Sequence, residues 1–319
     1  MTQHKPHALV IGSGVIGLTS ACRLLEAGFA VTLWARLLPP HTTSDVAAAF
    51  WSPSATAGDA RSKAWALASQ ATFRELAHDP ASGILLTDLY KLTRTPTPMP
   101  YMAHGDAMRV VPPGVFPPPW SGYCAKVPRI DVPVYMPWLL ERCRSLGGVI
   151  AQRIIQTWDE IGRDYGVVVN CTGLGAQALT GDAMFPIRGQ VMSVRKPAGL
   201  APDIIYADDD HEETTYIIPR SGDCLLGGTY QYRNGNTEVD MAIVDQILAR
   251  CAIFNPALRA PEILQHKVGL RPGRHAVRLE AEKLRTGQLL IHNYGHGSIG
   301  HTLSWGCAAE VTALAQAAL

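Results

Sequence analysis

Three glycines near the start of the chain have the spacing of a dinucleotide-binding turn. Gly12, Gly14 and Gly17 lie in ALVIGSGVIGLTS, where residues 8–11 predict a buried strand and residues 18–27 predict a helix. In such a turn the first glycine permits the sharp bend, the second lets backbone approach a pyrophosphate, and the third lets the helix pack on its strand. Free N–H groups at the helix start then bind the anion. The alternative is a glycine-rich turn without a ligand, and the flanking strand and helix argue against it.

The next informative position carries a positive charge. An acidic residue normally holds the adenosine ribose about 20 residues after such a turn, and this chain has Arg36 there. One interpretation is NADP, because an arginine would bind its 2′-phosphate. The other is a flavin dinucleotide whose adenosine half lies near the arginine.

Three adjacent hydroxyls follow and favour the flavin. They are Thr42, Thr43 and Ser44, in the segment HTTSDVAAAFWSP. Hydroxyl groups can hydrogen-bond phosphate oxygens, and the alanines at 47–49 would let backbone come close to a flat ring. Taken alone, the hydroxyls are equally explained as an ordinary helix cap, with Ser44 or Asp45 leading into the alanines.

The composition is that of a globular chain without a strong acidic or basic bias. Its 319 residues are 47% hydrophobic, which supplies a core for one large or two modest domains, and its net charge of +1 gives no argument for nucleic acid or a membrane surface as partner. The seven cysteines are scattered and lack CxxC spacing, so they predict neither a disulfide framework nor a metal site. No apolar run reaches the ~18 residues of a membrane span, no signal peptide is evident, and the final AQAAL is not a peroxisomal SKL signal. We expect a cytoplasmic protein.

Helical and strand patterns alternate along the chain. Further helices are predicted at 63–77, 131–145, 237–250 and 301–317. Further strands are predicted at 29–34, 149–155, 167–171 and 289–294, with several short strands between 186 and 228. The proline-rich passage 95–120 predicts loop and edge strand.

Eight sequence blocks give this chain a resemblance to a known family. In order they are VIGSGVIGL (10–18), TTSDVAAAFW (42–51), VVNCTGLGA (168–176), PIRGQV (186–191), YIIP (216–219), LGGTYQ (226–231), GLRPGR (269–274) and HNYGHGSIGHTLSWG (292–306). With these blocks the chain resembles the D-amino-acid oxidase family over nearly its full length. So many blocks in the family's order are more specific than any single motif.

The resemblance implies an α/β fold with two domains and a non-covalently bound FAD. We expect a Rossmann-like FAD-binding domain made of the discontinuous segments 1–58, 130–188 and 268–319. A substrate-binding domain of mainly antiparallel sheet would comprise 59–129 and 189–267. The resemblance places the following residues at the cofactor: Gly12, Ser13, Gly14, Val15, Ile16, Gly17, Arg36, Thr42, Thr43, Ser44, Ala48, Ala49, Phe50, Ile154, Thr172, Gly297, Ser298, Ile299, Gly300, His301 and Thr302.

The last block is expected to support the flavin ring electrostatically. Flavin reduction leaves negative charge near N1 and C2=O, and a helix start aimed at that edge presents unpaired N–H groups. His292, His296 and His301 suggest a metal or acid–base role, but no carboxylate cluster accompanies them and the family uses no histidine as base. We therefore expect His292 and His296 to be structural and His301 to contribute its backbone.

An amino-acid carboxylate calls for a planar bidentate donor, and three arginines lie close together in the sequence. Arg271, Arg274 and Arg278 are the candidates. The family's carboxylate arginine lies in the GLRP block, which selects Arg271, and its second donor is the tyrosine of YIIP, here Tyr216. Without the family, Arg271 would be read as a surface ion pair and Tyr216 as an ordinary strand aromatic. The family also fixes the substrate amine through a backbone carbonyl, here that of Ser298.

The chain departs from the family pattern around the substrate. Ser298 replaces a glycine of vertebrate members, Ser52 replaces a glutamine of mammalian members, and the second active-site tyrosine would fall near Glu212, with Tyr206 as a possible substitute. D-aspartate oxidases have an arginine after GGT, and this chain has Tyr230. A neutral or broad range of D-amino acids is therefore expected.

The resulting hypothesis is an FAD oxidase that transfers the substrate α-hydrogen as hydride to flavin N5 and reoxidises with O₂ to give H₂O₂. The imino acid would hydrolyse to keto acid and ammonia, with positioning and electrostatics rather than a base supplying the catalysis. Alternatives are a D-aspartate oxidase, a relative of glycine or sarcosine oxidases, and a flavin-stabilised binding or sensor protein. The expected partners are a small D-amino acid and O₂, without nucleic acid or membrane, and a homodimer is kept as one option.

Overall fold

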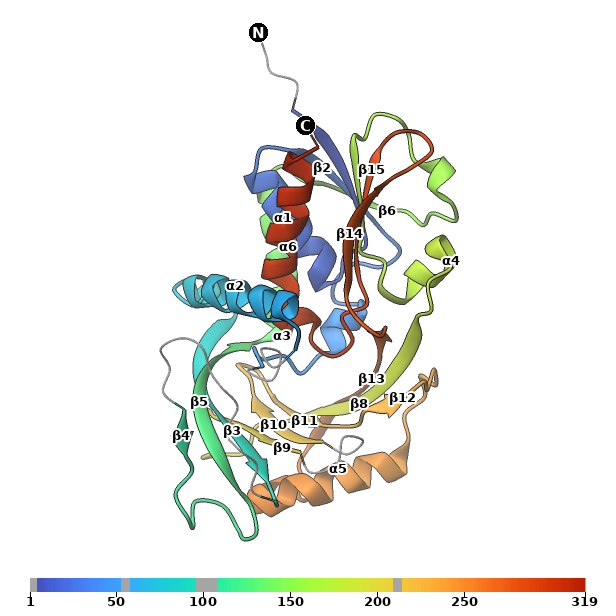
Figure 1. The fold of residues 1–319 in the computed structure, drawn as a ribbon. Helices are drawn as coiled ribbons and strands as arrows, with labels where there is room; N and C mark the ends of the chain where they lie inside the picture. Colours follow the sequence, from blue (N-terminus) through green and yellow to red (C-terminus); the bar gives the residue numbers. More distant parts are fainter. Residues whose placement is uncertain (1–4, 53–57, 96–107, 209–213, 319) are drawn as a thin grey trace.

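A six-stranded, largely parallel sheet forms the upper half of the molecule in Figure 1. The computed structural model describes residues 5–52, 58–95, 108–208 and 214–318. The strand order is β14-β15-β7-β1-β2-β6. These strands are β1 (His7–Ile11), β2 (Ala30–Ala35), β6 (Val149–Gln152), β7 (Val167–Asn170), β14 (Arg278–Lys283) and β15 (Leu289–Tyr294).

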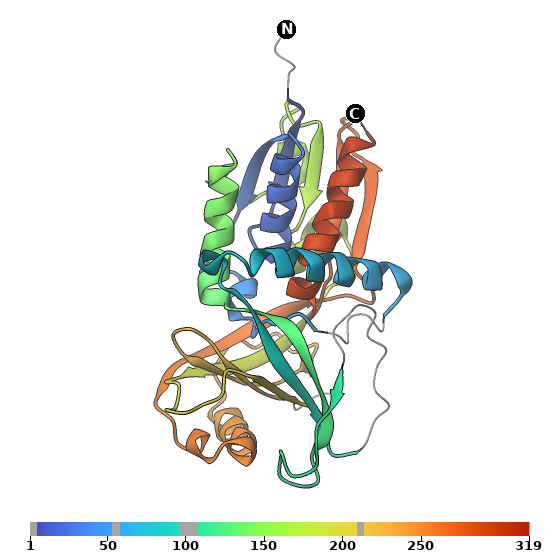
Figure 2. The ribbon, with the colours of Figure 1, turned by 90° about the vertical axis from the view of Figure 1, so that its left-hand side faces the viewer.

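The inner parallel strands β1, β2 and β7 are short apolar runs that are almost fully buried, because both of their faces are covered. Ala8 is in register with Val31 of β2 and with Val167 of β7, so β1 lies at the centre. Three helices stand side by side along one face in Figure 2. They are α1 (Val15–Glu26), α3 (Val132–Ser145) and α6 (Gly300–Gln316), and α2 (Ala60–Leu76) crosses near their lower ends.

A nine-stranded, mainly antiparallel sheet forms the other half. Its order is β12-β8-β11-β10-β9-β3-β5-β4, and β13 pairs with β8. The strands are β3 (Ile84–Thr93), β4 (Arg109–Val110), β5 (Ser121–Ile130), β8 (Phe185–Val194), β9 (Ile204–Ala207), β10 (Thr215–Pro219), β11 (Cys224–Gly227), β12 (Gln231–Tyr232) and β13 (Ile263–Gly273).

Alternation along these strands separates an apolar face from a functional face. The helix α5 (Met241–Phe254) packs on the face that carries Met192, Ile217 and Leu226, and together they form one apolar cluster. Residues one position away, such as Tyr216, therefore point to the opposite face. The sheet turns this opposite face toward the first half of the molecule.

Two long strands connect the halves. β8 and β13 are antiparallel partners from the pair Val194 and Ile263 to the pair Phe185 and Gly273, and both run from the lower sheet toward the upper one (Figure 1). The proposed domain limits at 188 and 268 lie inside these strands. The expected fold class, α/β with a Rossmann-like part and a mainly antiparallel part, is confirmed.

The structure corrects part of the expected secondary structure. The helix predicted at 237–250 begins instead at Met241, because the Asp240 side chain accepts a hydrogen bond from the Ala242 N–H at 2.9 Å and caps the helix. The strands β3, β5, β13 and β14 were not predicted. Within the described ranges, no helix is both long enough and apolar enough to cross a membrane.

Candidate active site

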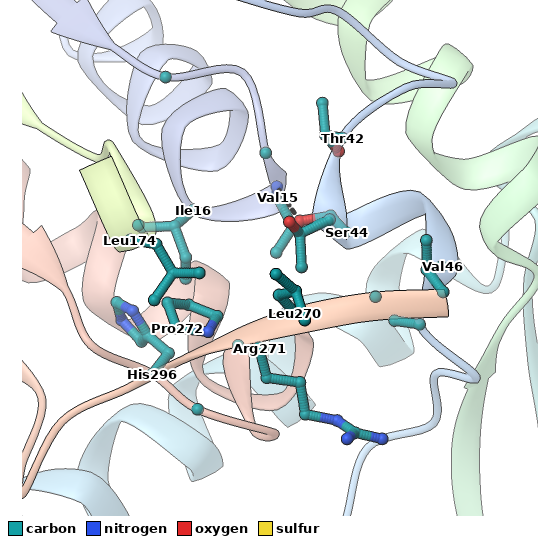
Figure 3. Close-up of a pocket in the computed structure, with 18 of the residues that line it drawn as sticks. Val15, Ile16, Thr42, Ser44, Val46, Leu174, Leu270, Arg271, Pro272 and His296 are labelled. Carbon is teal, nitrogen blue, oxygen red and sulfur yellow. Dashed lines mark hydrogen bonds between the residues drawn. The ribbon is translucent and has the colours of Figure 1, made fainter. Parts of the chain in front are cut away.

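One continuous cavity of about 1210 Å³ lies between the two halves. This volume exceeds the usual 300–1,000 Å³ of a pocket for one small ligand, so a dinucleotide and a small substrate can share it. Every residue that the resemblance assigned to the cofactor lines the cavity except Gly17, and so do Tyr216 and Arg271. Figure 3 shows the start of α1 with Ser44 on one side of β13 and the Arg271 side chain extending from the other.

The glycine turn has three different local reasons for its three glycines. Gly12 has φ +115°, and a Cβ there would lie 2.3 Å from the Cys171 carbonyl oxygen. A Cβ on Gly17 would lie 1.8 Å from the Gly12 oxygen, so the helix packs directly on the turn. Gly14 has an ordinary extended conformation, and its Cβ would meet only Ser44 Oγ, at 3.0 Å. The first and third glycines therefore serve the fold, whereas the second leaves space in the cavity, as a pyrophosphate requires.

The hydroxyl segment is both a helix cap and a wall of the cavity. Thr42 closes a capping box, since its N–H and hydroxyl donate to Asp45 Oδ2 at 2.8 and 2.6 Å. Ser44 Oγ accepts a hydrogen bond from the Val15 N–H at 2.9 Å. The first N–H of α1 is thus not free, contrary to the expectation, and the Ser44 hydroxyl keeps its own proton for an acceptor in the cavity.

The outer end of the cavity is open and cationic. Arg36 is exposed, and Ile154 is 57% exposed. Arg153 also lines this end, with its guanidinium 4.0 Å from the centre of the Trp34 ring. Thr172 also lines the cavity, and its hydroxyl donates to Asn170 Oδ1 at 2.7 Å.

The loop before α6 brings backbone donors and two neutral histidines to the inner wall. The helix has Ile299 as its N-cap without a side-chain cap, so its first N–H groups lack that partner, and residues 297–302 line the cavity. Burial lowers the pKa of His296 to about 3 and that of His301 to about 4. The Nε2 atoms of both are buried and have no hydrogen-bond partner among the described residues. His292 differs, because its Nε2 contacts Glu282 at 3.0 Å.

The substrate end is built from side chains lying on glycines. A Cβ on Gly189 would come within 2.4–2.6 Å of the Arg271 guanidinium, and a Cβ on Gly227 would come within 2.1 Å of the Tyr216 ring. Arg271 Nη1 also donates to the Thr229 carbonyl at 3.1 Å. Burial raises the pKa of Tyr216, and the nearby Arg271 charge only partly opposes this, so the phenol stays protonated and can donate.

The other two candidate arginines lie in a separate network. Arg274 Nε contacts Asp182 at 2.8 Å, and Arg278 donates to the Tyr294 hydroxyl at 2.8 Å. Tyr294 in turn donates to Asp182 at 2.9 Å. Neither arginine lines the cavity, in contrast to Arg271.

Aromatic side chains surround the substrate end. Tyr206 is the cross-strand neighbour of Tyr216, with parallel rings and centroids 6.4 Å apart, and Phe50 meets Tyr206 edge-on at 5.7 Å. The Tyr230 ring lies 5.5 Å from the Arg271 guanidinium. Ser52 and the exposed Ser298 line the cavity as well, whereas Glu212 lies outside the described residues.

Sequence reasoning missed the supports of these side chains. Gly189, Gly227, Gly228 and Thr229 hold Arg271 and Tyr216 in place, yet no role was assigned to them. Their signal was present in the blocks PIRGQV and LGGTYQ. No group of three or more histidine, cysteine or acidic side chains suited to hold a metal occurs among the residues described here.

Comparisons with known proteins agree with this geometry. Residues 7–314 match the family described as FAD dependent oxidoreductase. A D-amino-acid oxidase of Rubrobacter xylanophilus is 43% identical, covering 98% of this chain and 96% of the relative, and one of Streptomyces coelicolor is 39% identical, covering 96% of each. The D-aspartate oxidase of Homo sapiens is 35% identical, covering 96% of this chain and 93% of the relative.

A solved structure shares the fold. The glycine oxidase of Bacillus cereus superposes with a TM-score of 0.80 at 19% identity, covering 98% of this chain and 95% of that one. The resemblance to D-amino-acid oxidases is therefore confirmed by relatives that span the whole fold. An FAD cofactor fits the residues present, because the open space at Gly14, the Ser44 hydroxyl and the uncapped start of α6 all lie on one cavity. The chain belongs to the family of FAD-dependent oxidoreductases.

Proposed function

We propose that this protein oxidises D-amino acids to imino acids, with O₂ as the electron acceptor. The observation that carries the proposal is the pair of Arg271 and Tyr216, a cation and a protonated phenol held side by side in the cavity that also contains the glycine turn. A carboxylate is the ligand that such a pair selects. The relatives named D-amino-acid oxidase support the same chemistry.

The protein's own groups bind and orient the substrate. Arg271 would bind the carboxylate with its planar fork, Tyr216 would add a second donor, and the Ser298 carbonyl would accept a hydrogen bond from the amine. A bound flavin would supply the redox chemistry, as the acceptor of the substrate α-hydrogen as hydride and the donor of two electrons to O₂, which yields H₂O₂. The imino acid then hydrolyses in water to a keto acid and ammonia.

Among the described residues, the two buried histidines and Tyr216 are poorly suited to remove a proton. His296 and His301 are too weakly basic, since burial lowers their pKa values to about 3 and about 4. The raised pKa of Tyr216 keeps its phenol protonated. Catalysis therefore consists of positioning and of electrostatic support from the first N–H groups of α6.

The cofactor would be held without a covalent bond. Gly14 and Ser44 would contact the pyrophosphate, and residues 297–302 the ring edge. We further propose that segments 1–58, 130–188 and 268–319 form the flavin-binding domain and that 59–129 and 189–267 form the substrate-binding domain. A cytoplasmic location and a homodimer remain predictions for fractionation and sedimentation experiments.

The substrate range is proposed to be neutral or broad. Phe50, Tyr206, Tyr216 and Tyr230 give the substrate end aromatic walls. Tyr230 occupies the position where D-aspartate oxidases carry a cation, so a second carboxylate lacks its expected partner there. Because one relative is a D-aspartate oxidase, D-aspartate is the second candidate substrate.

A peroxide assay with a panel of D- and L-amino acids tests the proposal. D-alanine, D-methionine and larger neutral D-amino acids are expected to be oxidised, their L-isomers are not, and D-aspartate is expected to be poor. D-aspartate as the best substrate would select the second candidate, and glycine or sarcosine would select the oxidases of those compounds. A flavin-containing protein that turns over no amine would support a binding or sensor role instead.

A further inference from the structure

A fully buried arginine, Arg188, lies on the strand paired with the one that carries the substrate arginine. Arg188 is 1% exposed, and on β8 it is the cross-strand partner of Leu270, the neighbour of Arg271. Among the described residues no carboxylate contacts Arg188. A buried cation is costly unless its donors are satisfied, so its partners identify its role.

All four hydrogen bonds of Arg188 end on neutral oxygens. Nη1 donates to Gln231 Oε1 at 2.9 Å and Nη2 to Gln190 Oε1 at 2.7 Å. Nε donates to the Asn236 carbonyl at 3.0 Å, and Nη2 also to the Glu238 carbonyl at 2.6 Å. The arginine thus fastens an otherwise exposed segment, residues 234–240, to β8; we call this segment the strap.

Gln190 completes the attachment of the strap. Its amide donates to the Asp240 carbonyl at 2.8 Å, and its Oε1 accepts from the Asp240 N–H at 2.9 Å. The strap in turn contributes Thr237 to the lining of the cavity. The sequence had predicted the end of the strap as helix, and these bonds give the backbone another set of partners.

The same network reaches Arg271 in two steps. The Gln190 N–H donates to Thr229 Oγ1 at 2.9 Å, and the Thr229 carbonyl accepts from Arg271 Nη1 at 3.1 Å. Thr229 is 5% exposed and is followed by Tyr230, which lines the cavity beside Arg271. Arg188 and Gln190 therefore fix both the strap and the turn that aims the substrate arginine.

We propose that Arg188 is a positioning residue for substrate binding, acting through the strap and through Thr229 on Arg271. This inference rests on the proposed function of Arg271. Loss of the guanidinium frees the strap and lets the Arg271 side chain move out of its orientation, while the contacts at the flavin end of the cavity stay unchanged. The expected consequence is weaker substrate binding with a nearly unchanged rate at saturation.

Steady-state kinetics of flavin-loaded Arg188→Lys and Arg188→Met provide the test. Coupling through such networks is worth about 0.5–2 kcal/mol, so we expect KM for a neutral D-amino acid to rise roughly 2- to 30-fold with kcat changed by less than about 3-fold. Lysine should recover part of the loss because it keeps the charge and up to three donors. The inhibition constant of a simple carboxylate, acetate, should rise in parallel with KM.

Arg220→Lys is the matched control. Arg220 is also buried, at 2% exposure, but it pairs locally with Asp223 at 2.7 and 2.6 Å. It should cost stability without raising KM. Equal KM values in Arg188→Lys and wild type would overturn the proposal, as would a KM increase of the same size in Arg220→Lys. Wild-type protein that oxidises no D-amino acid would instead refute the proposed function itself. If Arg188→Met does not fold, Arg188→Lys alone decides.

Discussion

The two ends of the cavity use glycine for opposite purposes. At the flavin end, Gly12 and Gly17 let backbone touch backbone, with Cβ positions 2.3 and 1.8 Å from carbonyl oxygens. At the substrate end, Gly189 and Gly227 let the side chains of Arg271 and Tyr216 lie flat on a sheet. One end is therefore shaped by backbone packed on backbone, and the other by side chains that lie on glycines.

This difference separates general from specific recognition. Main-chain N–H groups bind any phosphate in reach, so the flavin end depends on local conformation. The substrate end depends on which side chains neighbouring strands bring together, and a changed residue there changes the ligand. Five predictions test this division, beginning with the largest expected effect.

Replacing Gly14 with Val should abolish flavin binding without disturbing the substrate end. The backbone conformation at Gly14 suits any residue, but the new side chain would occupy the space left for the pyrophosphate. We expect largely flavin-free protein with almost no activity, measured from the absorbance of the purified protein. Gly166→Val is the control, because a Cβ there meets nothing within 4 Å. Full flavin occupancy in the Gly14 variant would contradict the assignment.

Arg271→Ala should damage the substrate end and leave flavin content near normal. Removing one partner of a buried charge pair costs about 2 to 5 kcal/mol, or roughly 30-fold to several thousand-fold in kcat/KM. Arg271→Lys should recover only part of this loss, since an ammonium lacks the planar fork. Arg278→Ala is the matched control, because Arg278 does not line the cavity and contacts Glu280 and the Tyr294 hydroxyl instead. A nearly native kcat/KM in a flavin-loaded Arg271→Ala enzyme would refute the assignment.

Acidification should destabilise the loop where the two ends meet. His296 and His301 are buried and neutral with folded-state pKa values of about 3 and about 4, below the unfolded value near 6.5. The unfolded chain therefore binds more protons as pH falls below 6.5, and each histidine should cost about 2 to 3 kcal/mol of unfolding free energy by pH 4.5. Urea unfolding at pH 7.5 and 4.5 measures this. His301→Leu should reduce the pH dependence, whereas replacing the exposed His78 with Leu should not.

Tyr216→Phe should weaken the substrate end less than loss of the arginine. It removes one neutral donor to a charged acceptor, worth about 1.5 to 3 kcal/mol. The phenylalanine ring keeps the contact with Gly227, so folding and flavin content should stay unchanged. A loss of kcat/KM larger than that of Arg271→Ala would reverse the proposed ranking of the two donors.

Gly189→Ala should be the mildest of these changes. The methyl group would meet the end of the Arg271 side chain at 2.4–2.6 Å, and this flexible end can move. We expect a rise in KM on the order of 10-fold, because small displacements of a binding group weaken its alignment. Gly222→Ala, with open space around its Cβ, should leave KM unchanged.

The flavin end could be predicted from the sequence because its determinants are local. Gly12, Gly14 and Gly17 lie within six residues, and their flanking strand and helix have clear patterns. Arg271 and Tyr216 emerged only through resemblance to a family. Their supports, Gly189 and Gly227, become neighbours through strand register between distant segments, and no local pattern encodes that register.

The missed elements have similar causes. The start of α5 was predicted four residues too early because Thr237 and Asp240 are both acceptable helix N-caps. In the structure Asp240 caps the helix, and the residues before it hydrogen-bond to Arg188. β13 contains Pro272 and mixed polar residues, so its alternation is weak. Ser44 lines the cavity, but its hydrogen bond to the Val15 N–H depends on an approach between segments that local sequence does not reveal.

The central position of β1 has a consequence for how the chain folds. Ala8 pairs on one side with Val31, soon after synthesis, but on the other side with Val167. The edge of β1 that pairs with β7 therefore stays unpaired until Val167 has been synthesised, about 160 residues after Ala8. Unpaired apolar edges recruit other chains, so self-association should compete with folding during expression. Slower synthesis at low temperature is therefore expected to raise the soluble yield more than substitutions that stabilise the folded protein.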